Sequence, residues 1–265
     1  MDHRPQAWGR PRDDVYGAYD HSFMNTNSHP NQHTQQPLVT GTSVLAVKYK
    51  DGVVIAADNL GSYGSFARFT DVKRLHTFQD TSVVGFSGDI SDMQYITRHL
   101  HQKSIEESYA SSSANKKSRL SAANLHTYLS KMLYRRRSKM DPLWNHMLVV
   151  GFDDDEKPFV GSADLLGTTF TAPTLATGIG SMLAQPLLRT YAGTDEEAAE
   201  RTKEEAIKVI QECMKVLFYR DARSQETYSL AVVSREGVEM KTSEKLENMS
   251  WAFADRIKGY GTQTV

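Results

Sequence analysis

The dipeptide Gly41-Thr42 is the first place in this sequence where residue types suggest chemistry. A threonine hydroxyl is a poor nucleophile unless a base lies beside it. Cleavage of the chain before Thr42 would supply that base, because the new α-amino group has a pKa of about 8, close to the working range. Such a site also needs a cation and a carboxylate. A Gly-Thr pair alone indicates only the start of a strand, so its meaning depends on the surrounding pattern.

The elements around Thr42 come in groups of strands and groups of helices. Turn signals at Asp51-Gly52, Gln79-Asp80, Asp153–Glu156 and Arg235–Gly237 predict hairpins. This order predicts an α+β protein with four layers, an αββα sandwich of two antiparallel sheets flanked by helix pairs. The predicted strands are 43–49, 53–57, 75–78, 82–86, 147–152, 159–163, 228–234 and 238–241. Ser91 and Ser121 are expected to cap the first two helices, with a polar surface loop between them at 108–118. A third helix should begin near Ser181, and a fourth should run from about Asp195 to Tyr219.

Composition limits the class of protein. The chain has 265 residues, 39% of them hydrophobic and 24% charged, and a formal net charge of −1. A mean hydropathy of −0.50 predicts no membrane-spanning segment. The balanced charge argues against a nucleic-acid-binding protein. The one cysteine, Cys213, fits a reducing compartment, and we expect it to be an inert core residue on a helix stripe.

Residues 1–33 differ from the rest of the chain. They contain Pro5, Pro11, Pro30 and one branched aliphatic residue, Val15, so they show no hydrophobic period and cannot offset their ordering entropy. They lack the apolar region of a signal peptide. We interpret this segment as a disordered leader, either a removable pro-segment or a permanent tail. One folded domain is expected at 34–247.

Several motifs occur in order along the chain: 42–48, 52–58, Ser87-Gly88-Asp89, Gly178-Ile179-Gly180-Ser181 and 220–224. Together they resemble the β subunits of the proteasome. Three narrower stretches, 34–37 with Gly41-Thr42-Ser43, 58–65, and the tail from Trp251, resemble their type-4/type-7 branch, a non-catalytic one. The resemblance covers residues 34–265 and implies the fold of N-terminal-nucleophile hydrolases.

The resemblance allows the active-site positions of catalytic relatives to be compared with this chain. Five positions match: Thr42 as nucleophile, Asp58 at a strand end, Gly88 as oxyanion amide, and the supporting Asp221 and Ser224. Two positions depart from the pattern, because Arg74 replaces the active-site lysine and Ile179 replaces a serine.

Both departures affect proton handling. Neutralising an arginine at pH 7 costs about 7 kcal/mol, because its pKa exceeds about 12, so Arg74 can hold a charge but cannot share a proton. Ile179 removes a hydroxyl and would crowd the amine of Thr42. Self-cleavage before Thr42 should fail for the same reason. The resemblance instead implies a cut between His33 and Thr34, which leaves Thr34–Gly41 attached and Thr42 without a free amine.

The tail from residue 248 carries large apolar side chains beyond the last predicted hairpin. They predict an arm that is buried on another chain, and the alternative is a tail folded back on its own subunit. The resemblance favours an arm that reaches the opposite ring. The residues of this predicted contact are Trp251, Phe253, Ile257 and Tyr260.

The basic run Arg135–Lys139 lies where the helix after Ser121 should end, where positive charge complements the helix dipole. Nuclear import or nucleic-acid binding is one interpretation, and a buried or subunit-facing ion pair is the other.

The leading hypothesis is therefore a non-catalytic structural subunit of the 20S proteasome β ring, which closes the seven-membered ring and joins half-particles for ubiquitin-dependent protein degradation. Its partners would be other α and β subunits, with no nucleic acid, membrane, metal or cofactor, in the cytoplasm and nucleus. The alternatives are an active threonine endopeptidase that uses Thr42 and a free-standing binding domain. N-terminal sequencing separates the structural subunit, whose mature chain should begin at Thr34, from the endopeptidase, whose mature chain should begin at Thr42.

Overall fold

The computed structural model describes residues 36–111, 120–247 and 249–252. In this part of the chain the strands form two sheets, and every pair of neighbouring strands is antiparallel. The predictions that fall outside it concern His33, Thr34, Phe253, Ile257 and Tyr260.

The first sheet contains eight strands within the described residues, in the order β10-β9-β8-β7-β1-β4-β5, with β6 paired to β7 beside β1. Strand β7 pairs with β6 along its first half and with β1 at its end. The strands are β1 (Val39–Gly41), β4 (Gly61–Tyr63), β5 (Phe66–Phe69), β6 (Leu75–Phe78), β7 (Ser82–Asp89), β8 (Asn145–Phe152), β9 (Pro158–Ala163) and β10 (Thr169–Thr171).

The second sheet contains five strands within the described residues, in the order β11-β2-β3-β12-β13. All residues of β3 are buried, as its continuous apolar run predicts. The strands are β2 (Val44–Tyr49), β3 (Gly52–Asp58), β11 (Thr174–Ala176), β12 (Thr227–Ser234) and β13 (Gly237–Lys245).

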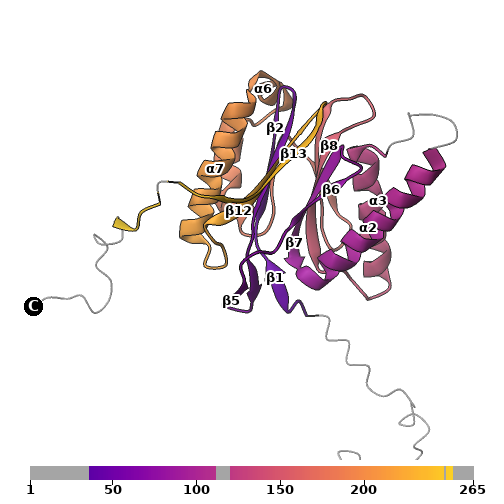
Figure 1. The fold of residues 1–265 in the computed structure, drawn as a ribbon, viewed down its shortest axis with the longest axis horizontal. Helices are drawn as coiled ribbons and strands as arrows, with labels where there is room; N and C mark the ends of the chain where they lie inside the picture. Colours follow the sequence, from indigo (N-terminus) through magenta and orange to yellow (C-terminus); the bar gives the residue numbers. More distant parts are fainter. Residues whose placement is uncertain (1–35, 112–119, 248, 253–265) are drawn as a thin grey trace, which may run out of the picture. The chain divides into compact units, whose positions relative to one another are not determined.

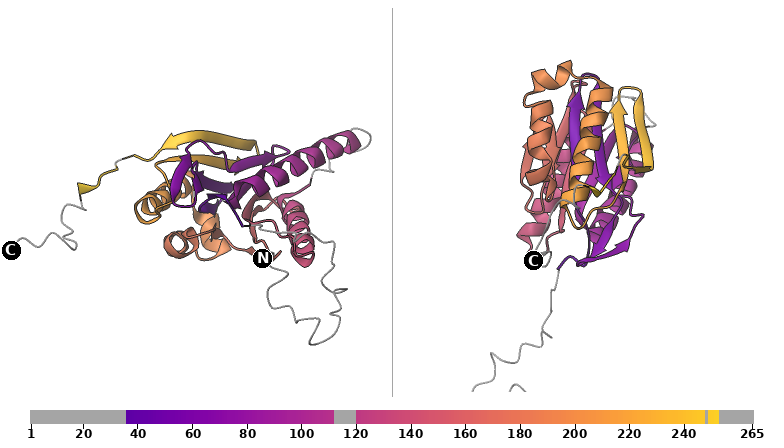
Figure 2. Two further views of the ribbon diagram at one scale, coloured as in Figure 1. Left: turned by 90° about the horizontal axis from the view of Figure 1, so that it is seen from below. Right: turned by 90° about the vertical axis from the view of Figure 1, so that its left-hand side faces the viewer.

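The helices cover the outer faces of the two sheets. Figure 1 and Figure 2 show α2 and α3 on one side of the strands and α6 and α7 on the other. The predicted αββα sandwich is confirmed. The helices are α2 (Ile90–Ser111), α3 (Ala122–Ser138), α4 (Gly180–Leu183), α5 (Gln185–Tyr191), α6 (Asp195–Glu200) and α7 (Lys203–Arg220), and none of these described helices is long and apolar enough to span a bilayer.

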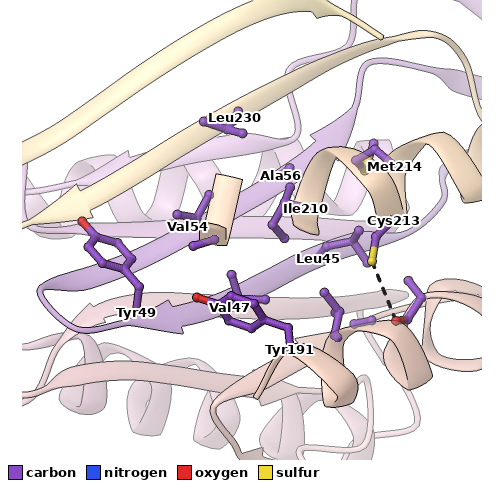
Figure 3. Packing of buried hydrophobic residues seen from close by; sticks show 14 of the residues in the cluster. Leu45, Val47, Tyr49, Val54, Ala56, Tyr191, Ile210, Cys213, Met214 and Leu230 are labelled. Carbon is purple, nitrogen blue, oxygen red and sulfur yellow. Dashed lines mark hydrogen bonds between the residues drawn. The ribbon is translucent and has the colours of Figure 1, made fainter. Parts of the chain in front are cut away.

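Three clusters of buried side chains hold these layers together. One lies between the two sheets and includes Ile55 and Leu148, and a second joins the first sheet to α2 and α3. The third joins the second sheet to α4–α7 and contains Cys213, whose thiol lies 3.9 Å from the Ala184 carbonyl (Figure 3). Burial raises the pKa of Cys213 to about 12, so the thiol is the inert core group that the helix stripe predicts.

The predicted start of α2 is wrong. Ser91 does not cap this helix. The carboxylate of Asp89 accepts a hydrogen bond from the Asp92 amide at 3.1 Å, and the Ser91 hydroxyl donates to the same carboxylate. A short acceptor three residues before an amide is the usual capping geometry, so Asp89 is the better candidate in the sequence itself. The helix then continues to Ser111, beyond the start of the loop predicted at 108–118.

The helix predicted from Asp195 to Tyr219 is two helices. Thr202 separates them, because its hydroxyl accepts from the Glu205 amide while the Glu205 carboxylate accepts from the Thr202 amide. This capping box starts α7 as a new helix, so α6 does not continue into it. The Ser121 cap is confirmed, with its hydroxyl 3.2 Å from the Asn124 amide. The short strands β1, β4, β5, β10 and β11 were not predicted, since three or four residues show too little periodicity.

Candidate functional site

Thr42 lies where the chain crosses from one sheet to the other. Gly41, at the end of β1, pairs with Gly88 in the first sheet, and Val44 begins β2 in the second. Asp58 ends the neighbouring strand β3. Figure 1 shows β1 near the lower end of β7, with which it pairs. The fold thus brings residues far apart in sequence to the linker between the two sheets.

The hydroxyl of Thr42 has a defined partner. It donates a hydrogen bond to the carboxylate of Asp221, with 2.5 Å between Oγ1 and Oδ2. Asp221 follows the last residue of α7, and its other carboxylate oxygen accepts from the Arg223 amide at 2.9 Å. Ser224 fixes the same turn, because its hydroxyl lies 2.8 Å from the Asp221 carbonyl and 3.1 Å from the Leu217 carbonyl. The structure therefore brings Thr42, Asp221 and Ser224 together.

Arg74 is completely buried beside Thr42, immediately before β6. Its Nη1 group lies 2.7 Å from the Thr42 carbonyl and 3.1 Å from the Phe86 carbonyl. Its Nε group lies 2.9 Å from the Asp58 carbonyl, and Nη2 donates to the Ser43 carbonyl at 3.1 Å and to the Asp58 carboxylate. A guanidinium has five N–H donors, and this arrangement uses all of them.

The pairing of Arg74 with Asp58 changes the electrostatics of the site. Burial raises the pKa of Asp58 to about 6, although the guanidinium and the Leu60 amide lower it. Desolvation therefore outweighs the charge pair, as it does for many buried ion pairs. Every N–H group of Arg74 has an acceptor. The side chain therefore joins its own segment to Asp58 of β3, to Phe86 of β7 and to the Thr42–Ser43 linker, and it offers no route for a proton.

Strand β1 comes directly before Thr42 in the chain and is paired on both of its edges. Val39 and Thr40 lie opposite Tyr63 and Ser62 of β4, and the other edge of β1 pairs with β7. The Leu38 amide donates to the Asp89 carboxylate at 3.1 Å, which holds the chain just before the strand. As long as Thr42 stays joined to this strand, its nitrogen is an amide and cannot serve as the base that a threonine nucleophile needs.

Two glycines make this arrangement possible. A Cβ atom on Gly41 would lie 2.4 Å from the Cδ atom of Arg74, so a side chain there would displace the buried guanidinium. Gly88 has a φ of 96°, and a Cβ atom on it would lie 2.1 Å from the Trp144 carbonyl. This position therefore requires a glycine, and its role as an oxyanion donor stays a prediction. In this structure Gly88 lies opposite Gly41 in the sheet.

Ile179 lies just before α4, and its side chain is 42% exposed. The neighbouring Gly180 amide donates to the Ser43 hydroxyl at 2.9 Å, which joins the glycine-rich loop to the Thr42 linker. The proposed crowding of the Thr42 amine by Ile179 stays a prediction. Ser43, which was not predicted as a site residue, is buried and bonded through both its hydroxyl and its carbonyl; its position after Thr42 was the available signal.

Two hollows flank β1. The first, of about 360 Å³, is lined by residues that include Thr42, Gly88 and Arg223. The second, of about 880 Å³, lies between β1, the 68–73 segment and the start of α2. His76 lines it, and burial lowers the pKa of this imidazole, so the neutral ring is favoured there. Within the described residues, no group of three or more His, Cys, Asp or Glu side chains gathers into a metal-ion site.

Trp251, the first predicted residue of the C-terminal contact, packs against its own subunit. Its ring lies 4.9 Å from the Tyr219 ring and 6.1 Å from the Phe218 ring, measured between centroids. The Tyr219 hydroxyl lies 2.8 Å from the Ser250 carbonyl. The tail therefore begins against α7, and half of the indole surface (55%) stays exposed.

Comparison with known proteins identifies the scaffold. The model of the family described as "Proteasome subunit" matches residues 38–233. The chain belongs to the proteasome subunit family. It is 47% identical to proteasome subunit beta type-7 of Saccharomyces cerevisiae, with 100% of both chains covered, and 44% identical to proteasome subunit beta type-4 of Xenopus laevis, with 87% and 92% covered.

A third relative, the probable proteasome subunit beta type-7 of Schizosaccharomyces pombe, is 48% identical over 98% of this chain and 97% of its own length. These similarities confirm the prediction of a β-type proteasome subunit on the type-4/type-7 branch, and with it a subunit without a catalytic role of its own.

Proposed function

We propose that this chain closes the β ring of a 20S core particle built from stacked seven-membered rings of α and β subunits, and that its Thr42 site works as a structural joint. The observation that carries this proposal is Arg74, whose five donors bind Asp58 of β3, Phe86 of β7 and the linker between the two sheets. Catalysis by the particle would then belong to neighbouring subunits, in ATP- and ubiquitin-dependent protein degradation.

The competing function, a threonine endopeptidase that uses Thr42, makes a different prediction. In purified particles, Thr42→Ala should leave every peptide-cleaving activity unchanged, because Arg74 cannot relay a proton and Thr42 has no free amine. The matched control is the equivalent threonine-to-alanine change in a catalytic neighbour, which should abolish one activity. Loss of an activity in Thr42→Ala particles, or a threonine-directed covalent inhibitor bonded to this chain, would establish the endopeptidase instead.

We also propose that the leader is cut between His33 and Thr34 in the mature subunit. The support comes from β1, which is paired on both edges and anchored by Asp89 through the Leu38 amide. A cut after Gly41 would detach this strand from the linker, whereas a cut after His33 leaves it intact. Mass measurement of the mature subunit should give a chain that begins at Thr34, and a chain that begins at Thr42 would contradict the proposal.

The C-terminal segment 248–265 is proposed as an arm that contacts the opposite ring and so joins two half-particles. Its support is the run of large apolar residues Trp251, Phe253, Ile257 and Tyr260 after the last strand. Deleting 253–265 should slow the joining of half-particles, seen as accumulation of the half-size species by native electrophoresis. Trp251→Ala removes the contact with α7 and only one of the four apolar side chains, so it should slow joining less than the deletion does. Normal joining after the deletion would show that the segment serves its own subunit alone.

Residence in both the cytoplasm and the nucleus is part of the same proposal. A fluorescent fusion that enters full particles should appear in both compartments, and restriction to another compartment would contradict it.

A further inference from the structure

The end of α3 presents charged and apolar side chains that the site around Thr42 does not use. Tyr134 and Met140 are 57% and 86% exposed, and Arg135, Arg137 and Lys139 are exposed as well. These five residues, here called the α3 patch, lie within seven positions of one another. They combine the residue types that are enriched in protein–protein interfaces, tyrosine, methionine and arginine.

The helix ends in a turn that places Met140 in an unfavourable backbone conformation. The Asp141 amide lies 3.1 Å from the Arg136 carbonyl and the Met140 amide lies 3.0 Å from the Arg137 carbonyl, which is the hydrogen-bond pattern of a Schellman motif. The residue at this position adopts a left-handed conformation, and Met140 has a φ of 56°. Glycine fits such a position without steric cost. The chain instead keeps a long apolar side chain there, pointing into solvent.

The basic run of α3 divides into two kinds of arginine. Arg136 forms an ion pair within the subunit, with Nε 2.9 Å from the Asp141 carbonyl and Nη2 3.0 Å from its carboxylate, so one role of the basic run is structural. Arg137 lies over the Tyr134 ring, 5.6 Å from its centroid. Among the described residues, no carboxylate lies within 4.0 Å of Arg135, Arg137 or Lys139.

Two carboxylates near the α3 patch, those of Asp141 and Asp164, already have partners. Asp141 binds Arg136, and Asp164 accepts hydrogen bonds from the Leu166 and Thr168 amides at 2.9 Å and 2.8 Å. Leu166 is itself 47% exposed. Its neighbour Gly167 lies so close to Tyr134 that a Cβ atom would be 2.7 Å from the Cβ of Tyr134. Positive charge therefore remains uncompensated near exposed apolar side chains.

We propose that the α3 patch docks on an acidic surface of another proteasome subunit. Three uncompensated cations require carboxylates, and the stacked Arg137–Tyr134 pair is preorganised to meet them. The exposed Met140 and Tyr134 side chains favour a protein over a nucleic acid, because phosphate contacts need cations and give no use to a methionine. This inference rests on the proposed assembly into rings and adds the chemistry of one contact.

The first test asks whether Lys139 meets a carboxylate in the assembled particle. Treatment of purified particles with a carbodiimide should join Lys139 to an aspartate or glutamate of another subunit, read out by mass spectrometry. The same lysine should react at least about tenfold less with an acetylating reagent in the particle than in the free chain. Equal acetylation in both states, or linkage only within this chain, would overturn the proposal.

The second test separates docking from folding. Met140→Gly relieves the left-handed strain, so it should raise the midpoint of thermal unfolding of the free chain by about 2 °C. The same variant should be incorporated severalfold less than tagged wild-type chain when both compete during assembly. A lower midpoint would show that Met140 supports its own fold, and equal incorporation would show that its side chain has no partner; either result overturns the proposal.

A third test uses charge reversal with a matched control. Arg137→Glu should lower incorporation about tenfold, whereas Lys208→Glu, the same change in charge at an exposed position of α7, should stay within about twofold of wild type. Binding of a 20-base-pair DNA duplex by the free chain, lost in Arg137→Glu, would assign the α3 patch to nucleic acid instead. If wild-type chain does not enter particles, the proposed function fails; if it enters and these variants enter equally, only the docking inference fails.

Discussion

Arg74 and Arg137 hold the same side chain in opposite environments. Arg74 is completely buried, and its five donors bind two strands and the Thr42 linker within its own chain. Arg137 lies at the solvent-exposed end of α3, stacked on the exposed Tyr134 ring. In the first environment the charge is desolvated and must be satisfied internally. In the second it stays hydrated and free to meet another molecule.

The difference shows how a hydrolase scaffold can become a structural one. A lysine at the Arg74 position would have three donors on a flexible stem, and burial could bring its pKa toward neutrality. The guanidinium keeps its charge and spreads its donors in a plane, so it can bond two strands and the linker at once. The same properties make an exposed arginine suitable for recognising carboxylates. Burial, more than residue type, decides which role applies.

The largest effect is expected from removing the buried guanidinium. Arg74→Met leaves the Asp58 carboxylate buried without its partner, so the free energy of unfolding should fall by about 3–5 kcal/mol. Arg137→Met, the matched exposed substitution, should change it by less than about 0.5 kcal/mol. Urea unfolding followed by tryptophan fluorescence measures both. Equal stability of the two variants would remove the distinction between the two arginines.

The pH dependence of stability should report the burial of Asp58. The folded pKa is about 6, above the value of about 4 expected when the chain unfolds, so the folded state binds the proton more tightly. This group's contribution to stability is present below pH 4 and lost as the pH rises through 6. Relative to Asp58→Asn, the free energy of unfolding should therefore fall by about 3 kcal/mol across this window.

Arg74→Met sharpens the pH experiment. Because the guanidinium lowers the pKa of Asp58, its removal should move the transition to higher pH. A transition that stays in place would mean that Arg74 and Asp58 are not electrostatically coupled.

A smaller effect is expected from filling the space beside Arg74. Gly41→Ala places a methyl group 2.4 Å from the Arg74 Cδ atom, so the guanidinium must shift, at a cost of about 1–3 kcal/mol in the free energy of unfolding. Gly193→Ala is the matched control, because its nearest neighbour lies at 3.6 Å and the change should be neutral. Thermal unfolding of the two variants measures the difference, and similar midpoints would show that the linker tolerates displacement.

The smallest effect distinguishes two arginines of the exposed run. Arg136→Met removes the ion pair with Asp141 and should lower the free energy of unfolding by at most about 1 kcal/mol, and less at high salt. Arg135→Met should have no measurable effect. Denaturant titrations at low and high salt compare them. A larger loss for Arg135→Met would show that this side chain has a structural partner.

Much of the fold could be predicted from local sequence patterns. The run Val53–Ala57 is apolar at every position and forms the fully buried strand β3, and the amphipathic stripe from Leu125 to Leu133, with the spacing of a helix, forms the inner face of α3. The cap at Ser121 was also evident from the sequence. These predictions succeed because hydrophobic period and caps are properties of a few neighbouring residues. The break at Thr202 had a visible signal as well, the Thr-x-x-Glu capping box.

The sequence by itself determined which groups are present near Thr42: a hydroxyl, carboxylates at Asp58 and Asp221, and a guanidinium that cannot release a proton at neutral pH. Only the tertiary structure decided where their hydrogen bonds go. The short strand β1 and the five partners of Arg74 depend on contacts between segments far apart along the chain, and three-residue strands leave no periodic signal. The exposure of Met140 in a left-handed turn was likewise decided by folding, because backbone strain depends on the conformation that the whole helix end adopts.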